Sequence, residues 1–228
     1  MLGAMTTTEA ATAPILLIPL GATEQHGPHL PLDTDTRIAV ALANRVASQV
    51  SQCAVAPALA FGASGEHQGF AGTMSIGNEA LQAVIIELAR CVSAWTEAVV
   101  FVSGHGGNHQ AMNRAVDQLR HEGHTVRCWS PHVAGADAHA GHTETSIMLA
   151  LHPELVRMDR AEAGAIESLS TLMPELVAGG VRAVSANGVL GDPQEANAAD
   201  GRRYIEQMTV VLASVVATLG ESIREEHA

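Results

Sequence analysis

The chain has no lysine, and all twelve of its basic residues are arginine. This absence excludes a catalytic Schiff base and the lysine of a phosphate-binding loop. Aromatic residues make up only 3% of the chain, so the core has to be built from Ala, Val, Leu and Ile. The formal net charge of −12 argues against nucleic acids and anionic membranes as partners, although ordinary solubility explains the same charge.

Cysteine is also scarce. Cys53, Cys91 and Cys128 are widely spaced and form no CxxC pair, which indicates buried thiols in a reducing compartment. The N-terminus lacks a basic segment, and the apolar run at residues 15–20 is too short for a signal peptide or a membrane span. We therefore expect a cytoplasmic protein.

Apolar runs alternate along the chain with segments of helical periodicity. The runs predict strands at residues 15–20, 55–59, 98–103, 125–129 and 181–184, and the periodic segments predict helices at 36–50, 79–95, 108–121, 143–151 and 200–223. This alternation predicts a layered α/β fold with a mainly parallel sheet. We expect residues 1–13 to be a flexible tail and residues 14–228 to be a single domain.

Three segments of the chain place carboxylate and imidazole groups just beyond predicted strands or at the start of a predicted helix. These groups belong to Glu24, His26 and Asp35, to His105, and to His139 and Glu144. In parallel sheets, functional groups collect beyond the carboxyl ends of the strands. Oxygen and nitrogen donors without thiolates suit Zn²⁺, Mn²⁺ or Fe²⁺ at a catalytic site.

Local spacing refines this expectation. Residues two apart on leaving a strand point the same way, so Glu24 and His26 are expected to face one pocket, each toward its own metal ion. Glycines around His105 let the backbone approach that pocket closely. Asp33 competes with Asp35 as a ligand, but capping of the following helix is the preferred role for Asp33.

The residues at 21–31 (GATEQHGPHLP), 104–108 (GHGGN) and 139–145 (HAGHTET) together resemble the creatininase (creatinine amidohydrolase) family over about residues 15–151. The short chain and the run PLDTDT at 31–36 are most similar to the mycofactocin-system branch, whose members are peptidases acting on a radical-modified precursor peptide. The resemblance implies a three-layer α/β/α sandwich, two divalent metal ions (Zn, Fe or Mn) per chain, and a homo-oligomer.

The resemblance also implies a ligand set. Glu24, Asp35 and His105 would hold one metal ion, while His26 and the bridging Asp35 would hold the other together with a further carboxylate. In creatinine-cleaving members that carboxylate lies two residues after the second-motif histidine. That position is Gly107 here, so we expect Glu144 to replace it.

A second departure concerns the substrate. Creatinine-cleaving members carry a tryptophan four residues before the third-motif histidine, where this chain has Gly135. The departure weakens the case for creatinine. We expect hydrolysis at the C-terminal end of a modified peptide, with a cyclic amide or a formamide as the alternative. A non-catalytic metal-binding protein is an alternative of another class.

The expected mechanism uses a metal-bridging hydroxide that attacks an amide carbonyl. His139 and Glu144 are the predicted catalytic residues, with His139 giving a proton to the departing amine. The residues expected to contact the substrate are Ser64, Glu66, His67, Gly106 and Asn108. The plainer alternatives are a buried structural role for His139, a place in the first helical turn for Glu144 and a solvated loop at residues 64–67.

Overall fold

The computed structural model describes residues 1–50 and 53–226. At its centre lies a four-stranded sheet in which all strands run parallel, in the order β2-β1-β3-β4. The strands are β1 (Ile15–Leu20), β2 (Cys53–Val55), β3 (Ala98–Ser103) and β4 (Val126–Trp129).

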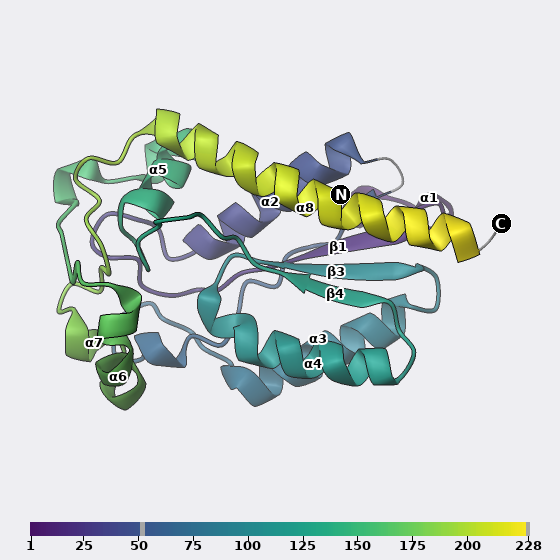
Figure 1. The fold of residues 1–228 in the computed structure, drawn as a ribbon, viewed down its shortest axis with the longest axis horizontal. Coiled ribbons are helices and arrows are strands. Elements are labelled where there is room, and N and C mark those ends of the chain that lie inside the picture. The colour runs from purple at the N-terminus through teal and green to yellow at the C-terminus, as the bar shows by residue number, and fades with distance from the viewer. Residues whose placement is uncertain (51–52, 227–228) are drawn as a thin grey trace.

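Helices cover both faces of this sheet (Figure 1). One face carries α2 (Thr34–Gln49), α5 (His142–Leu151) and α8 (Ala198–Glu226), and the other carries α3 (Gly77–Val92) and α4 (His109–His121). The short helices α6 (Leu169–Gly179) and α7 (Val181–Val184) lie together at one end of the molecule. The predicted α/β/α arrangement is confirmed.

The central strands β1 and β3 are apolar apart from Ser103, because both faces of the sheet are buried there. In β1, Ile15 and Leu17 pack into the core under α2 and α8, whereas Leu16 and Ile18 pack into the core under α3 and α4. All six residues of β1 and of β3 are buried. A sheet covered on one side only would have alternated apolar and polar residues.

The winding of the chain places a crevice between β1 and β3. From β1 the chain moves to β2 on one side, and then crosses to β3 on the other side of β1. Leu20 pairs with Ser103, so the two strands end at the same level. The loops that follow them diverge at this switch point, where α/β proteins commonly bind ligands.

The first turn of α2 is wedged into this crevice, and two glycines make room for it. A Cβ atom added to Gly21 would collide with Thr36, and one added to Gly104 would collide with the backbone of Asp35. Gly21 and Gly104, the first residues after β1 and β3, therefore allow Asp35 to lie between the two loops.

Two predicted elements differ from the structure. The predicted strand at 181–184 is wrong, because these residues form α7; Val181 is buried in a small cluster with Leu172 and Leu190, and this packing overrides the strand preference of valine. The strand predicted at 55–59 is β2, which ends at Val55 before Pro57; beyond it, Leu59 makes a single bridge to Leu20.

Residues 1–13 contain two helical turns, at Leu2–Ala4 and at α1 (Thr7–Ala10), and Leu2 and Met5 pack against the core. Flexibility of this segment and a domain reaching residue 228 stay predictions, and residues 227–228 lie outside the described residues. The prediction of buried thiols is wrong for Cys91, which is exposed.

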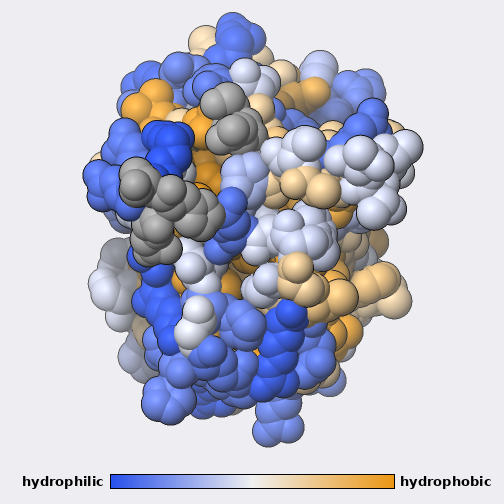
Figure 2. All heavy atoms as spheres, turned by 90° about the vertical axis from the view of Figure 1, so that its right-hand side faces the viewer, coloured by the Kyte–Doolittle hydropathy of each residue, from blue (hydrophilic) through white to orange (hydrophobic). Residues whose placement is uncertain are grey.

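Within residues 1–50 and 53–226, no helix combines the length and the apolar character that a bilayer crossing needs. Seen from the end where α8 finishes, the surface mixes hydrophilic and apolar residues, with hydrophilic side chains gathered toward its lower part (Figure 2).

Candidate metal centre

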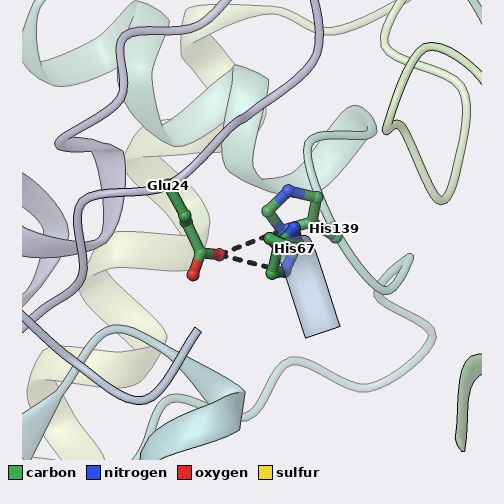
Figure 3. Close-up of side chains that lie close together, drawn as sticks. All are labelled: Glu24, His67 and His139. Atoms are coloured by element: carbon green, nitrogen blue, oxygen red, sulfur yellow. Dashed lines mark ion pairs between the residues drawn. The ribbon is translucent and has the colours of Figure 1, made fainter. Parts of the chain in front are cut away.

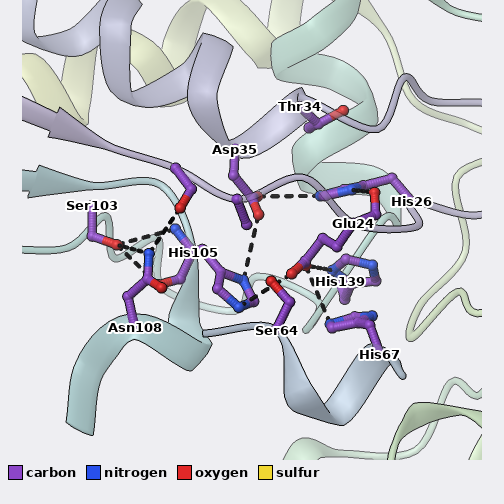
Figure 4. Close-up of polar contacts among 12 residues, drawn as sticks. Glu24, His26, Thr34, Asp35, Ser64, His67, Ser103, His105, Asn108 and His139 are labelled. Carbon is purple, nitrogen blue, oxygen red and sulfur yellow. Dashed lines mark hydrogen bonds and ion pairs between the residues drawn. The ribbon is translucent and has the colours of Figure 1, made fainter. Parts of the chain in front are cut away.

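The carboxyl ends of β1 and β3, the first turn of α2 and the start of α5 bring the predicted ligands together (Figure 4). Glu24, His26 and Asp35 are at most 1% exposed, and His105 is 5% exposed. Burying this many ionisable groups is costly unless they are paired or bind a cation.

Glu24, Asp35 and His105 form the first group. His105 Nε2 lies 3.2 Å from Glu24 Oε2, and His105 Nδ1 lies 3.4 Å from Asp35 Oδ2. His105 Nε2 also lies 3.3 Å from the carbonyl oxygen of Ala63, which can only accept a hydrogen bond. That carbonyl orients the ring and leaves Nδ1 facing Asp35, an arrangement typical of metal-ligating histidines.

His26, His139 and Glu144 form the second group. His26 Nε2 lies 3.8 Å from Glu144 Oε2 and 3.2 Å from Asp35 Oδ1, so Asp35 contacts histidines of both groups. His26 Nδ1 is 3.2 Å from the carbonyl oxygen of Glu24, and donation to that oxygen turns Nε2 toward the carboxylates.

Glu24 joins the first group to a third one, formed with His67 and His139 (Figure 3). Its Oε1 lies 3.2 Å from His67 Nε2 and 3.8 Å from His139 Nδ1. Neither carboxylate oxygen of Glu24, nor Oδ2 of Asp35, has a hydrogen-bond partner among the described residues. Buried carboxylate oxygens without partners are what a bound divalent cation would satisfy, so the donor set fits a metal site.

The charges within the site shift the pKa values strongly. Burial alone would lower the pKa of His26, but the neighbouring Asp35 raises it to about 10. Burial likewise opposes protonation of His105, yet Glu24 raises the pKa of His105 well above its usual value. Burial raises the pKa of Asp35 to about 6. Burial alone would raise the pKa of Glu24, but the nearby histidines, above all His105, lower it overall.

Three other histidines stay neutral. Burial lowers the pKa of His29 to about 4, that of His67 to about 3, and that of His139 to below its usual value. His29 Nε2 lies 2.8 Å from the Thr145 hydroxyl. The site therefore contains both histidines that favour a proton and histidines that exclude one.

The start of α5 fixes Glu144. The backbone N–H of Ala140 donates to Glu144 Oε2 at 2.6 Å. Ala140 has a φ of 51°, and it is the one non-glycine residue with positive φ among those described. Asp137 accepts hydrogen bonds from the backbone N–H groups of His142 and Thr143, which caps the helix. A strained backbone and a cap together hold the carboxylate in place.

Asn108 lies behind the site, and its predicted contact with the substrate stays a prediction. Its side chain is fully buried, Oδ1 accepts from the backbone N–H of Ala63 at 2.9 Å, and Nδ2 donates to the carbonyl oxygen of Gly21 at 3.0 Å. Asn108 directly precedes α4 but makes no side-chain cap bond to this helix. Asn108 instead ties three loops together behind the site.

The Ser64 hydroxyl is buried without a partner among the described residues.

Asp33 precedes α2 as expected, but its side chain makes no cap bond either. Its carboxylate accepts from Arg37 Nε at 2.7 Å at the surface. Asp35, two residues further on, is the carboxylate that enters the site. The preference for Asp35 over Asp33 as the site residue agrees with this geometry.

Glu66 occupies the space beside Gly107. A Cβ atom added to Gly107 would collide with the carboxylate of Glu66 and the ring of His105. Glu66 Oε1 lies 3.4 Å from His105 Nε2. The Glu66 carboxylate therefore lies where a side chain at position 107 would have projected. Glu66 is thus a second candidate, beside Glu144, for the carboxylate that Gly107 cannot supply.

The site opens into a cavity of about 770 Å³. The polar side of the cavity is formed by Glu66, His67, His105, Gly106, His139 and Glu144. The apolar side is formed by Leu169, Met173, Leu176, Val177, Val181 and Leu190. Val177 on α6 is 80% exposed, although it is apolar. The cavity therefore offers ionisable groups on one wall and exposed apolar side chains on the other.

A model of the creatinine amidohydrolase family matches residues 3–216 of this chain. The chain belongs to the creatininase family. It is 52% identical over 215 residues to a protein of Mycobacterium ulcerans named mycofactocin precursor peptide peptidase, with 91% of this chain and 86% of the relative covered. The family is one of metal-dependent amidohydrolases, so the chain is a hydrolase of amide bonds.

Solved structures support the same fold. A crystal structure of creatinine amidohydrolase superposes with a TM-score of 0.80 at 24% identity, covering 95% of this chain and 96% of that one. A structure titled "Creatininase Mn" superposes with a TM-score of 0.76 at 26% identity, covering 99% and 97%. Creatininases of known structure thus include a manganese form.

Proposed function

We propose that this chain is a divalent-metal-dependent peptidase that cleaves the C-terminal end of a radical-modified mycofactocin precursor peptide. The observation that carries the proposal is the convergence of Glu24, Asp35 and His105 with His26 and Glu144 around buried carboxylate oxygens that lack partners. The 52% identity to a mycofactocin precursor peptide peptidase over most of both chains supports the substrate.

Glu24, Asp35 and His105 would hold one metal ion, and His26, Asp35 and Glu144 would hold a second, so that both ions would share Asp35. The donor set accepts Zn²⁺, Mn²⁺ or Fe²⁺. Divalent ions bound there supply Lewis acidity and lower the pKa of a coordinated water. Assembly as a homo-oligomer and a cytoplasmic location belong to the same proposal.

His139 is assigned the proton transfers. Its Nε2 lies 2.9 Å from the carbonyl oxygen of Gln25, an obligatory acceptor, so Nε2 carries the hydrogen and Nδ1 presents a lone pair to Glu24 and Glu144. Because burial keeps the ring neutral, Nδ1 can take a proton from the attacking water and pass it to the departing amine.

The cavity favours a peptide over a small ring. Its volume of about 770 Å³ is in the range of sites for ligands much larger than creatinine. Apolar side chains of α6, among them Leu169 and Met173, face the same cavity as the ionisable groups. They supply a wall against which apolar side chains of a peptide can pack.

Mass spectrometry of the modified precursor peptide, before and after treatment with metal-loaded protein, tests the proposal. We expect release of a C-terminal fragment, with no release after chelation of the metal. Creatinine and a formylamino compound are the comparison substrates. Turnover of either in place of the peptide would make the chain a cyclic-amide or formamide hydrolase, and many weak metal sites without turnover would make it a binding protein.

A further inference from the structure

Gln25, which separates Glu24 from His26, has an unusually well determined side-chain orientation. Its Oε1 lies 2.9 Å from the backbone N–H of Gly27, a group that can only donate. Its Nε2 lies 3.0 Å from the carbonyl oxygen of Gly188, a group that can only accept. These two backbone groups fix which end of the amide is oxygen and which is nitrogen.

The orientation of Gln25 determines the hydrogen positions on His67. Gln25 Nε2 lies 2.8 Å from His67 Nδ1. Gln25 Nε2 also lies 3.1 Å from His139 Nε2, but that nitrogen carries a hydrogen for the Gln25 carbonyl and cannot accept another. One amide hydrogen of Gln25 therefore goes to Gly188 and the second to His67. His67 Nδ1 is therefore an acceptor. A neutral ring that accepts at Nδ1 carries its hydrogen on Nε2.

A hydrogen on His67 Nε2 excludes this nitrogen as a metal ligand, because ligation requires the lone pair. The group of Glu24, His67 and His139 is thus not a third metal site, although its atoms are close enough. Glu24 Oε1 is 3.2 Å from His67 Nε2 but makes no hydrogen bond among the described residues. The N–H is consequently available to a ligand in the cavity that His67 lines.

The place of His67 suits one step of amide hydrolysis. Its ring centroid is 4.4 Å from that of His139 and 5.9 Å from that of His105. We infer that His67 is a catalytic N–H donor to the carbonyl oxygen of the scissile amide, and that Gln25 is the positioning residue that sets its tautomer. This inference rests on the proposed function.

In the step concerned, the water oxygen bonds to the carbonyl carbon and the C=O π electrons move to the carbonyl oxygen. That oxygen accepts a stronger hydrogen bond from His67 as its negative charge grows, and no proton leaves His67. An electron pair on the oxygen then re-forms the C=O bond as the C–N bond breaks. The C–N electron pair goes to the nitrogen, which receives the proton that His139 took from the water. His67 acts as a neutral donor in this step, because its hydrogen is shared with the oxygen and is not transferred.

Nuclear magnetic resonance on zinc-loaded protein labelled with [¹⁵N]histidine tests the tautomer without reference to activity. The ring signals of His67, assigned by their loss in His67→Gln, should report hydrogen on Nε2 and a bare Nδ1. Hydrogen on Nδ1, or zinc on Nε2, would overturn the inference.

Variants then test the donor role. His67→Ala should keep the metal content of the wild type by mass spectrometry, while kcat falls roughly 10²–10³-fold with little change in KM. His67→Gln, whose amide can also donate, should recover part of the loss. His109→Ala removes an exposed histidine at the start of α4 and should change neither quantity. Loss of metal from His67→Ala would make His67 a ligand instead.

Gln25→Glu tests the positioning role, because a carboxylate beside Nδ1 favours hydrogen on that nitrogen. It should lower kcat about as much as His67→Ala, and the two changes together should cost no more than His67→Ala alone. Additive losses would overturn the coupling. If Gln25→Glu fails to fold, the tautomer of the wild type and the His67 variants still decide. A metal-loaded wild type that cleaves no amide would overturn the proposed function, whereas metal loss from His67→Ala overturns the donor role alone.

Discussion

β1 and the loop after it are both buried, but they bury opposite kinds of side chain. Every residue of Ile15–Leu20 is apolar or proline and packs into the core. The next fifteen residues bury Glu24, His26, His29 and Asp35 instead. Burial stabilises the strand, whereas it destabilises the charged forms of the loop residues unless partners compensate.

The apolar residues of β1 stabilise the fold, whereas the charged residues of the loop form the proposed metal site. A residue of β1 should matter for the free energy of unfolding and not for metal binding by the folded protein. A charged residue of the loop should matter for metal binding and catalysis.

Asp35→Ala should remove both metal ions and nearly all turnover. Asp35 contacts His26 and His105, one from each proposed site, so its loss opens both. The acceleration lost would be most of what an enzyme provides, at least about 10⁶-fold. Metal content per chain and peptide turnover measure the effect. Two metal ions and full activity in this variant would end the two-metal assignment.

His139→Ala should keep the metal ions and lose turnover by roughly 10²–10⁴-fold, the range for removal of a general acid or base. His139 also belongs to groups of residues whose side-chain atoms lie close enough together to hold a metal ion. The metal content of the variant therefore distinguishes a ligand from a residue that transfers protons. Metal analysis beside single-turnover kinetics makes the distinction. Loss of metal from this variant would show that His139 is a metal ligand.

Leu17→Ala should act in the opposite way. Leu17 is fully buried in β1, and truncation of such a residue costs about 2–5 kcal/mol in the free energy of unfolding. Urea unfolding measures the cost. Metal content per folded chain should equal that of the wild type. A selective loss of metal would contradict the view that residues of β1 affect stability alone.

The sequence predicted the apolar half of this comparison well. Strand β3 has the predicted bounds, and β1 does too, because a run of buried apolar residues leaves little choice of structure. The strand predicted at 181–184 failed because its two valines fit a helical turn against Leu172 and Leu190 equally well. Such packing depends on residues distant in sequence.

The site was predictable in its members but not in its contacts. The motifs identified the residues that converge, but motifs carry no information about which atom faces which. Asn108 shows the limit, since its amide ties Gly21 to Ala63 behind the site. Gln25 was missed because alternation after β1 predicts that it points away from Glu24 and His26, whereas residues 21–25 are not a strand.

The pH dependence offers a smaller effect with a definite sign. The folded-state pKa of His26, about 10, exceeds its unfolded value near 6.5. Its contribution to the stability of the metal-free protein is therefore complete below pH 6.5 and is lost as the pH rises through 10. His105, whose pKa is also raised, changes stability in the same direction.

Metal binding must displace these protons, so the metal affinity should rise between pH 6.5 and 9, by up to about tenfold per pH unit for each proton released. Chelator competition measures the affinity, and thermal unfolding of the metal-free protein measures the opposite trend in stability. An affinity independent of pH would mean that the histidines are already deprotonated before the metal arrives.

Asp33→Ala should have the smallest effect, although it lies only two residues from Asp35 and carries the same charge. Its carboxylate is 41% exposed, and its partner Arg37 is four residues away on the surface of α2. Exposed pairs of this kind contribute about 0.3–0.5 kcal/mol, because water screens them and both side chains lose rotamer freedom. Metal content and turnover should match the wild type. If Asp33→Ala lost metal as Asp35→Ala is expected to, burial would no longer explain which carboxylate of the loop holds the cation.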